Sequence, residues 1–300
     1  MPDESDYPHL KESAREAMGL TDAERIVFIR AGEWIPYPRA KEVLDHMEEL
    51  FEYPRIDRMP NMLLVGPSNN GKTQILNRFM DLHPNDSNPE KEYSTIPIIM
   101  VEAPKSADIG ILYDRIFEEI NQPFSSRGPY PEKERQILKV LDKVQLKMLI
   151  IDEIQHLIAG GQTKQREFRN ALKSLGNMLK ISIVGAGIEE AFNAFNTDPQ
   201  LSNRFEPEFL PKWKFDNAYG MLLNSLERMT PLKHASHLSE PKLATKIHYM
   251  SEGIIGEIHE VVKRAAVGAI KSGAEKITLK SLEEIRWTQP SKRKQMPSPG

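Results

Sequence analysis

The 300-residue sequence contains no cysteine, which excludes disulfides, thiol nucleophiles and thiolate zinc sites and fits a reducing compartment. It also has no long apolar run. The longest runs, such as 62–65 and 96–101, are far shorter than the roughly 20 residues that cross a bilayer. Residues 1–10 are acidic and polar, whereas a secretory signal begins with basic residues followed by an apolar stretch. We therefore expect an intracellular protein without a membrane span.

A strong net charge is also lacking, since the formal charge is −3 at pH 7. So small a charge does not attract a polyanion, and any contact with nucleic acid requires a local basic patch. The charge is uneven, because residues 1–58 hold fourteen acidic and eight basic side chains. We expect an acidic N-terminal arm with linker helices over 1–58, one of them opened by a capping box of Thr21 and Glu24.

The sequence has 39% hydrophobic and 28% charged residues, which is typical of a globular protein. From residue 59, short apolar runs alternate with segments of helical period. The runs expected to be strands are 61–65, 96–101, 148–151 and 181–184. This alternation predicts an α/β fold over 59–213, in which a parallel sheet carries helices on both faces.

After Trp213 only helical patterns remain, and the strongest apolar stripe lies over 254–271. Ser281 and Glu284 are read as a second capping box. These patterns predict a small α-helical domain over 214–288. Residues 289–300 are expected to form a disordered basic tail, and the tail and the acidic arm are expected to contact partners.

The first chemical signal is a complete G-x-x-x-x-G-K-T motif between a predicted strand and a predicted helix. Its backbone amides can surround phosphate groups, and the helix N-terminus adds a favourable partial charge. We expect Lys72 on the β- and γ-phosphates of ATP and Thr73 on Mg²⁺. The candidate nucleotide contacts are Gly66, Pro67, Ser68, Asn69, Asn70, Gly71, Lys72, Thr73 and Gln74.

The second signal is the apolar run 149–151 followed by Asp152 and Glu153. A parallel sheet brings the carboxyl end of this strand to the phosphate loop. We expect Asp152 to hold Mg²⁺ through water and Glu153 to polarise the water that attacks the γ-phosphate. The sequence therefore predicts an ATP hydrolase.

Such a hydrolase needs a positive charge on the γ-phosphate, which a neighbouring subunit often supplies. Arg204 follows the 181–184 strand and its helix, where we expect the edge of a subunit. Arg204 is therefore the candidate for a catalytic arginine that acts in trans. An ordinary surface arginine is the alternative interpretation.

Together, the phosphate loop, the Asp-Glu strand, the Ser-Asn-Arg-Phe segment and the helical C-terminal domain resemble an AAA+ ATPase. More narrowly, three segments resemble the TniB family, which is related to TnsC: WIPYPRA at 34–40, RMPN at 58–61 and SNNGKT at 68–73. The resemblance spans about Trp34 to Trp287.

This resemblance implies a target-selection ATPase of a bacterial transposon, located in the cytoplasm. Such a protein assembles with ATP as a ring or helical filament on double-stranded target DNA. Its implied partners are a DDE-type transposase, which it recruits or activates, and a further target-selection protein. Hydrolysis then resets the assembly.

The resemblance also implies roles for single residues. Tyr37 and Arg39 become candidate contacts of the adenine base. The strand end at 181–187 lacks the Asn or Thr with which AAA+ proteins often orient water, and Glu257 stands where many relatives carry a phosphate-sensing arginine. Both departures favour slow hydrolysis, which suits a switch.

Contact with DNA is expected from Lys105 and from a flexible basic loop over 160–166 that carries Lys164 and Arg166. A second basic stripe, spaced by four residues, is Arg135, Lys139, Lys143 and Lys147. A solvated helix face is the alternative explanation of this stripe.

The sequence also allows two other functions. One is a helicase loader or replication initiator of the AAA+ class. The other is a nucleotide-gated protein scaffold that scarcely hydrolyses ATP, which the unusual segments at 181–187 and Glu257 favour.

Overall fold

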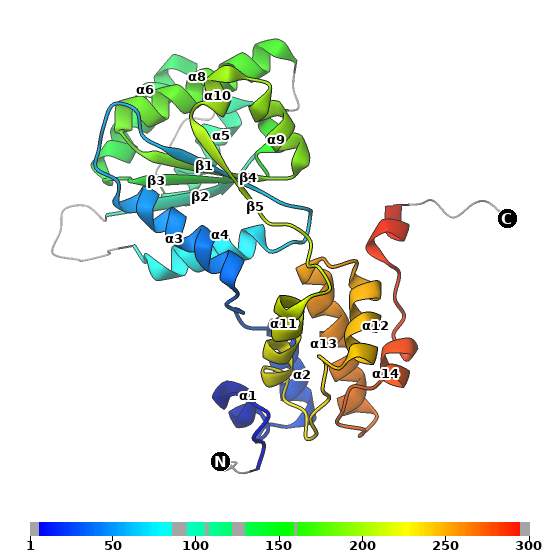
Figure 1. Cartoon of the computed structure of the whole chain (residues 1–300). Helices are drawn as coiled ribbons and strands as arrows, with labels where there is room; N and C mark the ends of the chain where they lie inside the picture. Colours follow the sequence, from blue (N-terminus) through cyan, green and yellow to red (C-terminus); the bar gives the residue numbers. More distant parts are fainter. Residues whose placement is uncertain (1–5, 86–94, 106–107, 122–129, 159–160, 295–300) are drawn as a thin grey trace. The chain divides into compact units, whose positions relative to one another are not determined.

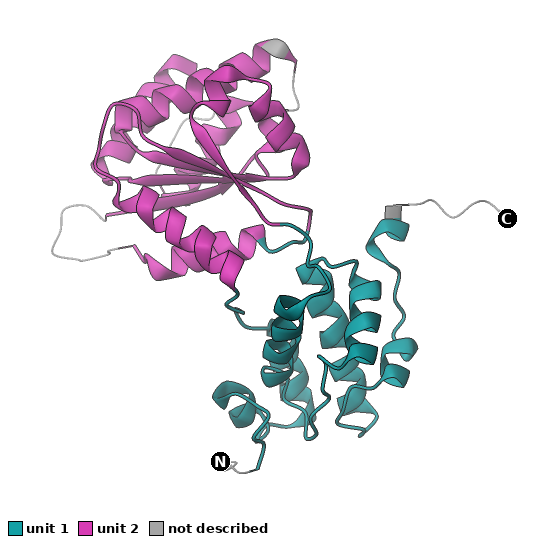
Figure 2. Ribbon diagram, viewed as in Figure 1, with its two compact units in different colours: residues 1–37, 69–71, 211–300 teal, residues 38–68, 72–210 magenta. Residues whose placement is uncertain are grey.

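The computed structural model describes residues 6–85, 95–105, 108–121, 130–158 and 161–294. The chain divides into two compact units (Figure 2). The sheet unit comprises 38–68 and 72–210, and the helical unit comprises 1–37, 69–71 and 211–300. The boundaries differ from those expected at 58 and 213, because residues 38–58 belong to the sheet unit and residues before 38 to the helical unit.

Within the described residues, the sheet unit has five parallel strands in the order β2-β3-β4-β1-β5 (Figure 1). The strands are β1 (Asn61–Val65), β2 (Ile98–Glu102), β3 (Met148–Asp152), β4 (Ser182–Gly187) and β5 (Phe205–Phe209). The helices are α3 (Pro38–Glu52), α4 (Lys72–Leu82), α5 (Ile109–Glu119), α6 (Tyr130–Lys143), α7 (Gln155–Ile158), α8 (Gln162–Leu179), α9 (Glu189–Asn196) and α10 (Pro199–Ser202).

Helices α3 and α4 cover one face of the sheet, and α5, α6, α8 and α9 cover the other (Figure 1). Strands β1, β3 and β4 are buried along their whole length, as a parallel sheet covered on both faces requires. Because all strands run the same way, their carboxyl ends share one edge, where Val65 pairs with Gly187 and Glu102 with Asp152. The predicted α/β fold with helices on both faces is confirmed.

Strand β5 is not predicted by the sequence pattern. Its residues, Phe-Glu-Pro-Glu-Phe, carry two charges and a proline, and most of them are exposed. β5 lies at the edge of the sheet and pairs with β1. A proline and charged side chains are tolerated at an edge, where the outer side of the strand needs no hydrogen-bond partner.

The helical unit consists of α1 (Glu12–Ala17), α2 (Asp22–Ala31), α11 (Asn217–Arg228), α12 (Pro241–Ser251), α13 (Ile255–Lys271), α14 (Leu279–Glu284) and a 3₁₀ helix (Pro290–Lys294). Its core forms around α13, whose buried stripe includes Ile258, Val261, Val262 and Ala265. The predicted small helical domain is confirmed. None of the helices in the described ranges combines the length and hydropathy needed to cross a bilayer.

The predicted cap of α2 is confirmed, since Thr21 and Glu24 form a reciprocal capping box. The cap predicted at Ser281 and Glu284 is wrong. Thr278 caps α14, and Ser281 completes the box by accepting a hydrogen bond from the Thr278 backbone at 2.8 Å. Both hydroxyl residues can open a helix, and the one that lies three residues earlier does so.

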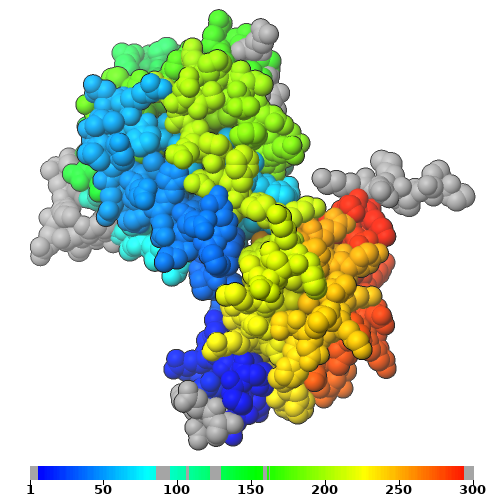
Figure 3. Space-filling view, in the orientation of Figure 1, coloured from blue at the N-terminus to red at the C-terminus, as the bar shows by residue number. Residues whose placement is uncertain are grey.

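The acidic N-terminal segment packs into the helical unit from residue 6 onward. Lys11 N donates to Arg228 O at 2.8 Å, and Ile29 and Ile35 lie in the core of the unit. In the space-filling view, the first described residues, in dark blue, lie against the yellow segment that follows α11 (Figure 3). Apolar side chains on α2 and in the segment after it therefore outweigh the acidic composition of these residues.

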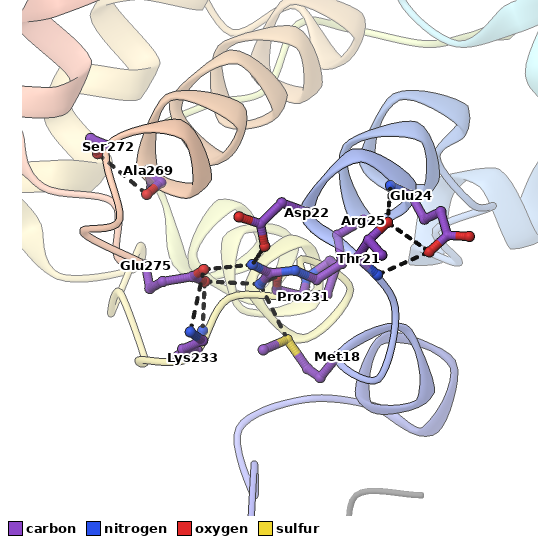
Figure 4. Close-up of polar contacts among 10 residues, drawn as sticks. All are labelled: Met18, Thr21, Asp22, Glu24, Arg25, Pro231, Lys233, Ala269, Ser272 and Glu275. Carbon is purple, nitrogen blue, oxygen red and sulfur yellow. Dashed lines mark hydrogen bonds and ion pairs between the residues drawn. The ribbon is translucent and has the colours of Figure 1, made fainter.

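A buried ion pair fixes α2 within this unit (Figure 4). The guanidinium of Arg25 is 2% exposed and donates to both carboxylate oxygens of Glu275, at 2.5 and 2.9 Å. It also donates to Asp22 Oδ1 at 2.8 Å and to Pro231 O at 3.2 Å. Because each buried charge has a bidentate partner, the pair is fully hydrogen-bonded.

Candidate nucleotide site

The G-x-x-x-x-G-K-T loop leaves the carboxyl end of β1 and enters α4 at Lys72. The Lys72 side chain is buried, and its Nζ donates to Gly66 O at 2.8 Å and to Pro67 O at 3.0 Å. Burial lowers the pKa of Lys72, against the opposite effect of Glu153 and Asp152. An ammonium group is thus held inside the loop on two carbonyl oxygens that phosphate oxygens can replace.

Thr73 and Asp152 meet at the same edge of the sheet. Thr73 Oγ1 donates to Asp152 Oδ2 at 2.6 Å, and Asp152 is 5% exposed at the end of β3. Two oxygen donors this close suit a hard cation such as Mg²⁺, which takes one or two protein ligands and completes its shell with phosphates and water. Among the described residues, no cluster of three or more His, Asp or Glu side chains offers a metal site of its own.

Glu153 directly follows β3 in a left-handed backbone conformation, with φ of 53°. Its backbone N donates to Asp152 Oδ1 at 2.8 Å, and its carboxylate accepts a hydrogen bond from the Gln155 side chain. A Cβ atom on Gly187 would lie 2.8 Å from Gln155 Oε1, so this glycine makes room for the amide. Gln155 therefore restrains the predicted water-activating carboxylate.

The role of Gln155 is not apparent from the sequence. Gln155 comes three residues after the end of β3, and its contact depends on Gly187, which comes 32 residues later. The lack of an Asn or Thr at the end of β4 has the same structural reason, because a larger side chain at Gly187 would meet both Gln155 and Ala191.

The tip of the loop, Asn69–Gly71, belongs to the helical unit. Asn69 is left-handed, with φ of 59°, and its carbonyl accepts from Gly256 N at 3.0 Å. Asn70 is buried, accepts from Ile255 N at 3.2 Å and donates to Pro211 O at 3.1 Å. The two variable asparagines of the motif thus bind the start of α13.

Tyr37 and Arg39 lie in different surroundings. The Tyr37 ring packs edge-to-face on Trp213 with centroids 5.3 Å apart, and its hydroxyl lies 3.6 Å from the position of a Cβ on Gly71. Tyr37 is therefore next to the loop. Arg39 donates to Phe209 O at 2.9 Å and forms ion pairs with Glu42 and Glu208, so its guanidinium is engaged at the end of β5.

Arg204 precedes β5, and its Nη1 donates to Asn177 Oδ1 at 3.2 Å. Phe205 pairs with Asn61 at the start of β1, whereas the phosphate loop follows the end of that strand. The five residues of β1 span about 16 Å at roughly 3.3 Å each. The structure therefore keeps Arg204 away from the phosphate loop of its own chain.

The predicted flexible loop over 160–166 is wrong for the residues that the structure describes, and Gly160 lies outside them. Helix α8 begins at Gln162 and carries Lys164 and Arg166, both exposed. Lys164 Nζ lies 3.3 Å from Glu167 Oε2 and 3.9 Å from Asp108 Oδ2. Lys105 is exposed after β2.

The basic stripe of four residues does not form a single helix face. Helix α6 ends at Lys143, so Lys147 lies beyond it. Lys147 Nζ instead lies 4.8 Å from the centroid of the Phe51 ring. Arg135, Lys139 and Lys143 remain on α6.

The comparisons with known proteins agree with this geometry. The family model of the bacterial TniB protein matches residues 25–215. No match was found among curated proteins.

Three solved structures show the same fold. The ORC2 protein of Aeropyrum pernix, in ADPNP-ADP complexes, is 15% identical, has a TM-score of 0.64 and aligns over 90% of this chain and 74% of its own. Cdc6p of Pyrobaculum aerophilum is 16% identical, with a TM-score of 0.56 and coverage of 86% and 68%. The ORC1 protein of A. pernix, in complex with DNA, is 14% identical, with a TM-score of 0.55 and coverage of 84% and 65%.

The likeness shows that the chain shares the fold of these proteins, and the predicted AAA+ fold is confirmed. The family match covers well over half of the chain and includes the phosphate loop, the Asp-Glu strand end and Arg204. The chain belongs to the bacterial TniB family.

Proposed function

We propose that this protein is an ATP-dependent DNA-transposition protein of the bacterial cytoplasm. It binds ATP and Mg²⁺, oligomerises on double-stranded target DNA and recruits or activates a DDE-type transposase, with a further target-selection protein as an additional partner. The observation that carries this proposal is the convergence of Lys72, Thr73, Asp152 and Glu153 at one edge of the sheet in a chain of the TniB family.

In this proposal, Lys72 leaves the carbonyls of Gly66 and Pro67 for the β- and γ-phosphates. Thr73 and Asp152 hold Mg²⁺, which neutralises the charge that develops on the phosphates. Glu153 accepts a proton from the attacking water after the Gln155 amide has released the Glu153 carboxylate. The restraint by Gln155 supports slow turnover, because the Glu153 carboxylate must leave this hydrogen bond before it can contact the attacking water.

Arg204 supplies the charge on the γ-phosphate of a neighbouring copy. The separation of Arg204 from the loop of its own chain supports an action in trans. This role requires a homo-oligomer, as a ring or a helical filament, in which each active site combines residues of two copies.

Lys105, Lys164 and Arg166 are the proposed DNA contacts of each copy. They are exposed, and repetition along an oligomer multiplies a few phosphate contacts into tight binding. The net charge of −3 is therefore compatible with a DNA-binding assembly. One protein of the same fold, the ORC1 protein of A. pernix, has been solved in complex with DNA.

The test is binding of the purified protein to random duplex DNA with ATP, a non-hydrolysable analogue, ADP or no nucleotide. Anisotropy reports the binding, and negative-stain microscopy reports the assembly. We expect DNA binding and oligomers with the triphosphates alone, and neither for Lys72→Ala. Absence of DNA binding in every nucleotide state, or normal assembly of Lys72→Ala with ATP, contradicts the proposal.

A nucleotide-gated scaffold that scarcely hydrolyses ATP is the second candidate. Two observations favour it: Glu153 is bound by Gln155, and Glu257, a carboxylate, stands at the start of α13. A scaffold assembles with ATP as well, so the rate of hydrolysis decides between the two.

A further inference from the structure

Glu257 and Arg293 form a bidentate ion pair in the helical unit. Arg293 Nη1 lies 2.9 Å from Glu257 Oε1, and Nη2 lies 2.6 Å from Oε2. The Glu257 side chain is only 9% exposed, whereas the Arg293 side chain is 42% exposed. A carboxylate so deeply buried requires a charged partner, and this arginine supplies it.

The same carboxylate contacts the tip of the phosphate loop. Asn69 Nδ2 donates to Glu257 Oε1 at 3.0 Å, and the adjacent Gly256 N donates to Asn69 O at 3.0 Å. A Cβ atom on Gly256 would lie 2.1 Å from Asn69 Oδ1, so the loop and the helix are in close contact here. A negative charge therefore lies directly against a loop whose motif is built for a polyanion.

Arg293 is held in place by the segment that carries it, residues 287–293. Trp287 Nε1 donates to Met250 O at 2.8 Å, and the guanidinium of Arg293 lies 4.8 Å from the centroid of the Trp287 ring. The backbone N of Ser291 donates to Glu252 Oε1 at 3.1 Å. The expectation of a disordered tail from residue 289 is therefore wrong up to residue 294, because an ion pair, hydrogen bonds and a ring contact order this stretch. Residues 295–300 lie outside the described residues.

We propose that Arg293 is a positioning residue of the nucleotide site: it neutralises Glu257 and so permits tight binding of a nucleoside triphosphate by the loop. This inference rests on the proposed nucleotide binding. Without Arg293, the buried Glu257 carboxylate would contact the tip of the phosphate loop through Asn69 with no charged partner, which opposes the binding of a polyanion by that loop. The 287–293 segment, far in sequence from the motif, thus sets the affinity of the site.

A double-mutant cycle in the full chain tests this inference. The readout is equilibrium binding of a non-hydrolysable ATP analogue with Mg²⁺. Arg293→Ala is expected to weaken binding about tenfold, and Glu257→Gln to change it by less than about threefold. The double variant Arg293→Ala/Glu257→Gln is expected to return to within about threefold of wild type, because the unpaired charge is gone. Arg293→Lys, which keeps the charge and loses the bidentate geometry, is expected to lie between.

One control matches the change without touching Glu257. Arg264 also lies over the Trp287 ring, at 5.3 Å, and pairs with Glu260, so Arg264→Ala removes the same charge from the same ring. Arg264→Ala is expected to bind the analogue like wild type. A charge effect also predicts that the defect of Arg293→Ala shrinks as salt is raised.

The outcomes separate this inference from the proposed function. If wild type binds no better than Lys72→Ala, the proposed nucleotide binding fails and the inference fails with it. If wild type binds and Arg293→Ala binds equally well, the inference alone is overturned. It is also overturned if the double variant is as weak as Arg293→Ala, because Arg293 then acts through the fold.

Discussion

Among single residues, Glu153 decides whether the protein is a hydrolase. Glu153→Gln keeps the size of the side chain and its contact with Gln155, but removes the base. We expect ATP hydrolysis to fall at least about 100-fold, the usual contribution of a general base, while binding of the analogue stays the same. Steady-state phosphate release beside wild type measures this. Equal rates would establish the scaffold function in place of hydrolysis.

The residues of the nucleotide site differ in how far the sequence predicts them. Lys72, Thr73 and Asp152 were predicted from local motifs, and the structure brings their side chains together at one edge of the sheet. Gln155 and Arg293 were not, because their contacts depend on Gly187 and on Glu257, which lie 32 and 36 residues away in sequence. Such contacts leave no local pattern.

At the scale of the secondary-structure element, α13 contains a histidine that resists protonation. Burial, together with the nearby Lys263, lowers the pKa of His259 from 6.5 to about 4. Between these values the unfolded chain binds the proton and the folded chain does not, so stability falls as the pH drops from about 6.5 towards 4. Between pH 7 and pH 5 the free energy of unfolding falls by about 2 kcal/mol.

Replacing His259 is expected to remove this dependence of stability on pH. We expect the difference in unfolding free energy between wild type and His259→Gln to shift by about 2 kcal/mol in favour of the variant between pH 7 and pH 5. Urea unfolding at the two pH values, followed by circular dichroism, measures the shift. A constant difference would mean that His259 titrates alike in the folded and unfolded chain.

Elements with a clear apolar period were predicted, and those with mixed composition were not. The fully buried strands β1, β3 and β4 are plain apolar runs, whereas the edge strand β5 contains a proline and two glutamates. The start of α8 was missed for another reason. Its first turns are polar and follow two glycines, a composition typical of a loop, yet the buried Phe168 and Leu172 further along anchor the helix.

At the scale of the whole chain, Arg25 and Glu275 join segments 250 residues apart. Removing one partner leaves a buried charge without compensation, so we expect Arg25→Ala to lower the unfolding free energy by about 3 to 5 kcal/mol. Asp22→Ala serves as the control, because Asp22 is 71% exposed and its contact with Arg25 is worth less than about 1 kcal/mol. Chemical unfolding followed by the tryptophan signal measures both. Similar small losses for the two variants would contradict the structural role of the pair.

The acidic composition of residues 1–58 suggested an arm for partners, but the structure places the described part of this segment in two folded units. Composition counts charges without showing which of them are paired. Arg25 is buried on Glu275, and the apolar residues Ile29 and Ile35 fill the core. The arrangement therefore depends on contacts with the second half of the chain, which a local charge count does not register.

Mixtures of two variants test whether Arg204 acts in the active site of a neighbouring copy. If Arg204 acts on a neighbouring copy, Arg204→Ala and Lys72→Ala are each inactive alone. In a mixture, the Arg204→Ala copies bind ATP and take Lys72→Ala copies into the oligomer, which restores sites that combine the Lys72 of one copy with the Arg204 of the next. In an equal, random mixture, about a quarter of the interfaces are of this kind, so we expect about a quarter of the wild-type ATPase rate. The rate is measured with DNA present, after the subunits have been mixed without nucleotide.

A matched control uses the double variant Lys72→Ala/Arg204→Ala mixed with Lys72→Ala, in which no subunit can bind ATP, and no activity is expected. Recovery in the first mixture and none in the second would require shared active sites and hence a homo-oligomer. An inactive first mixture would place the role of Arg204 within its own chain. Full activity of Arg204→Ala alone would make it an ordinary surface arginine, held by Asn177 at the start of the edge strand.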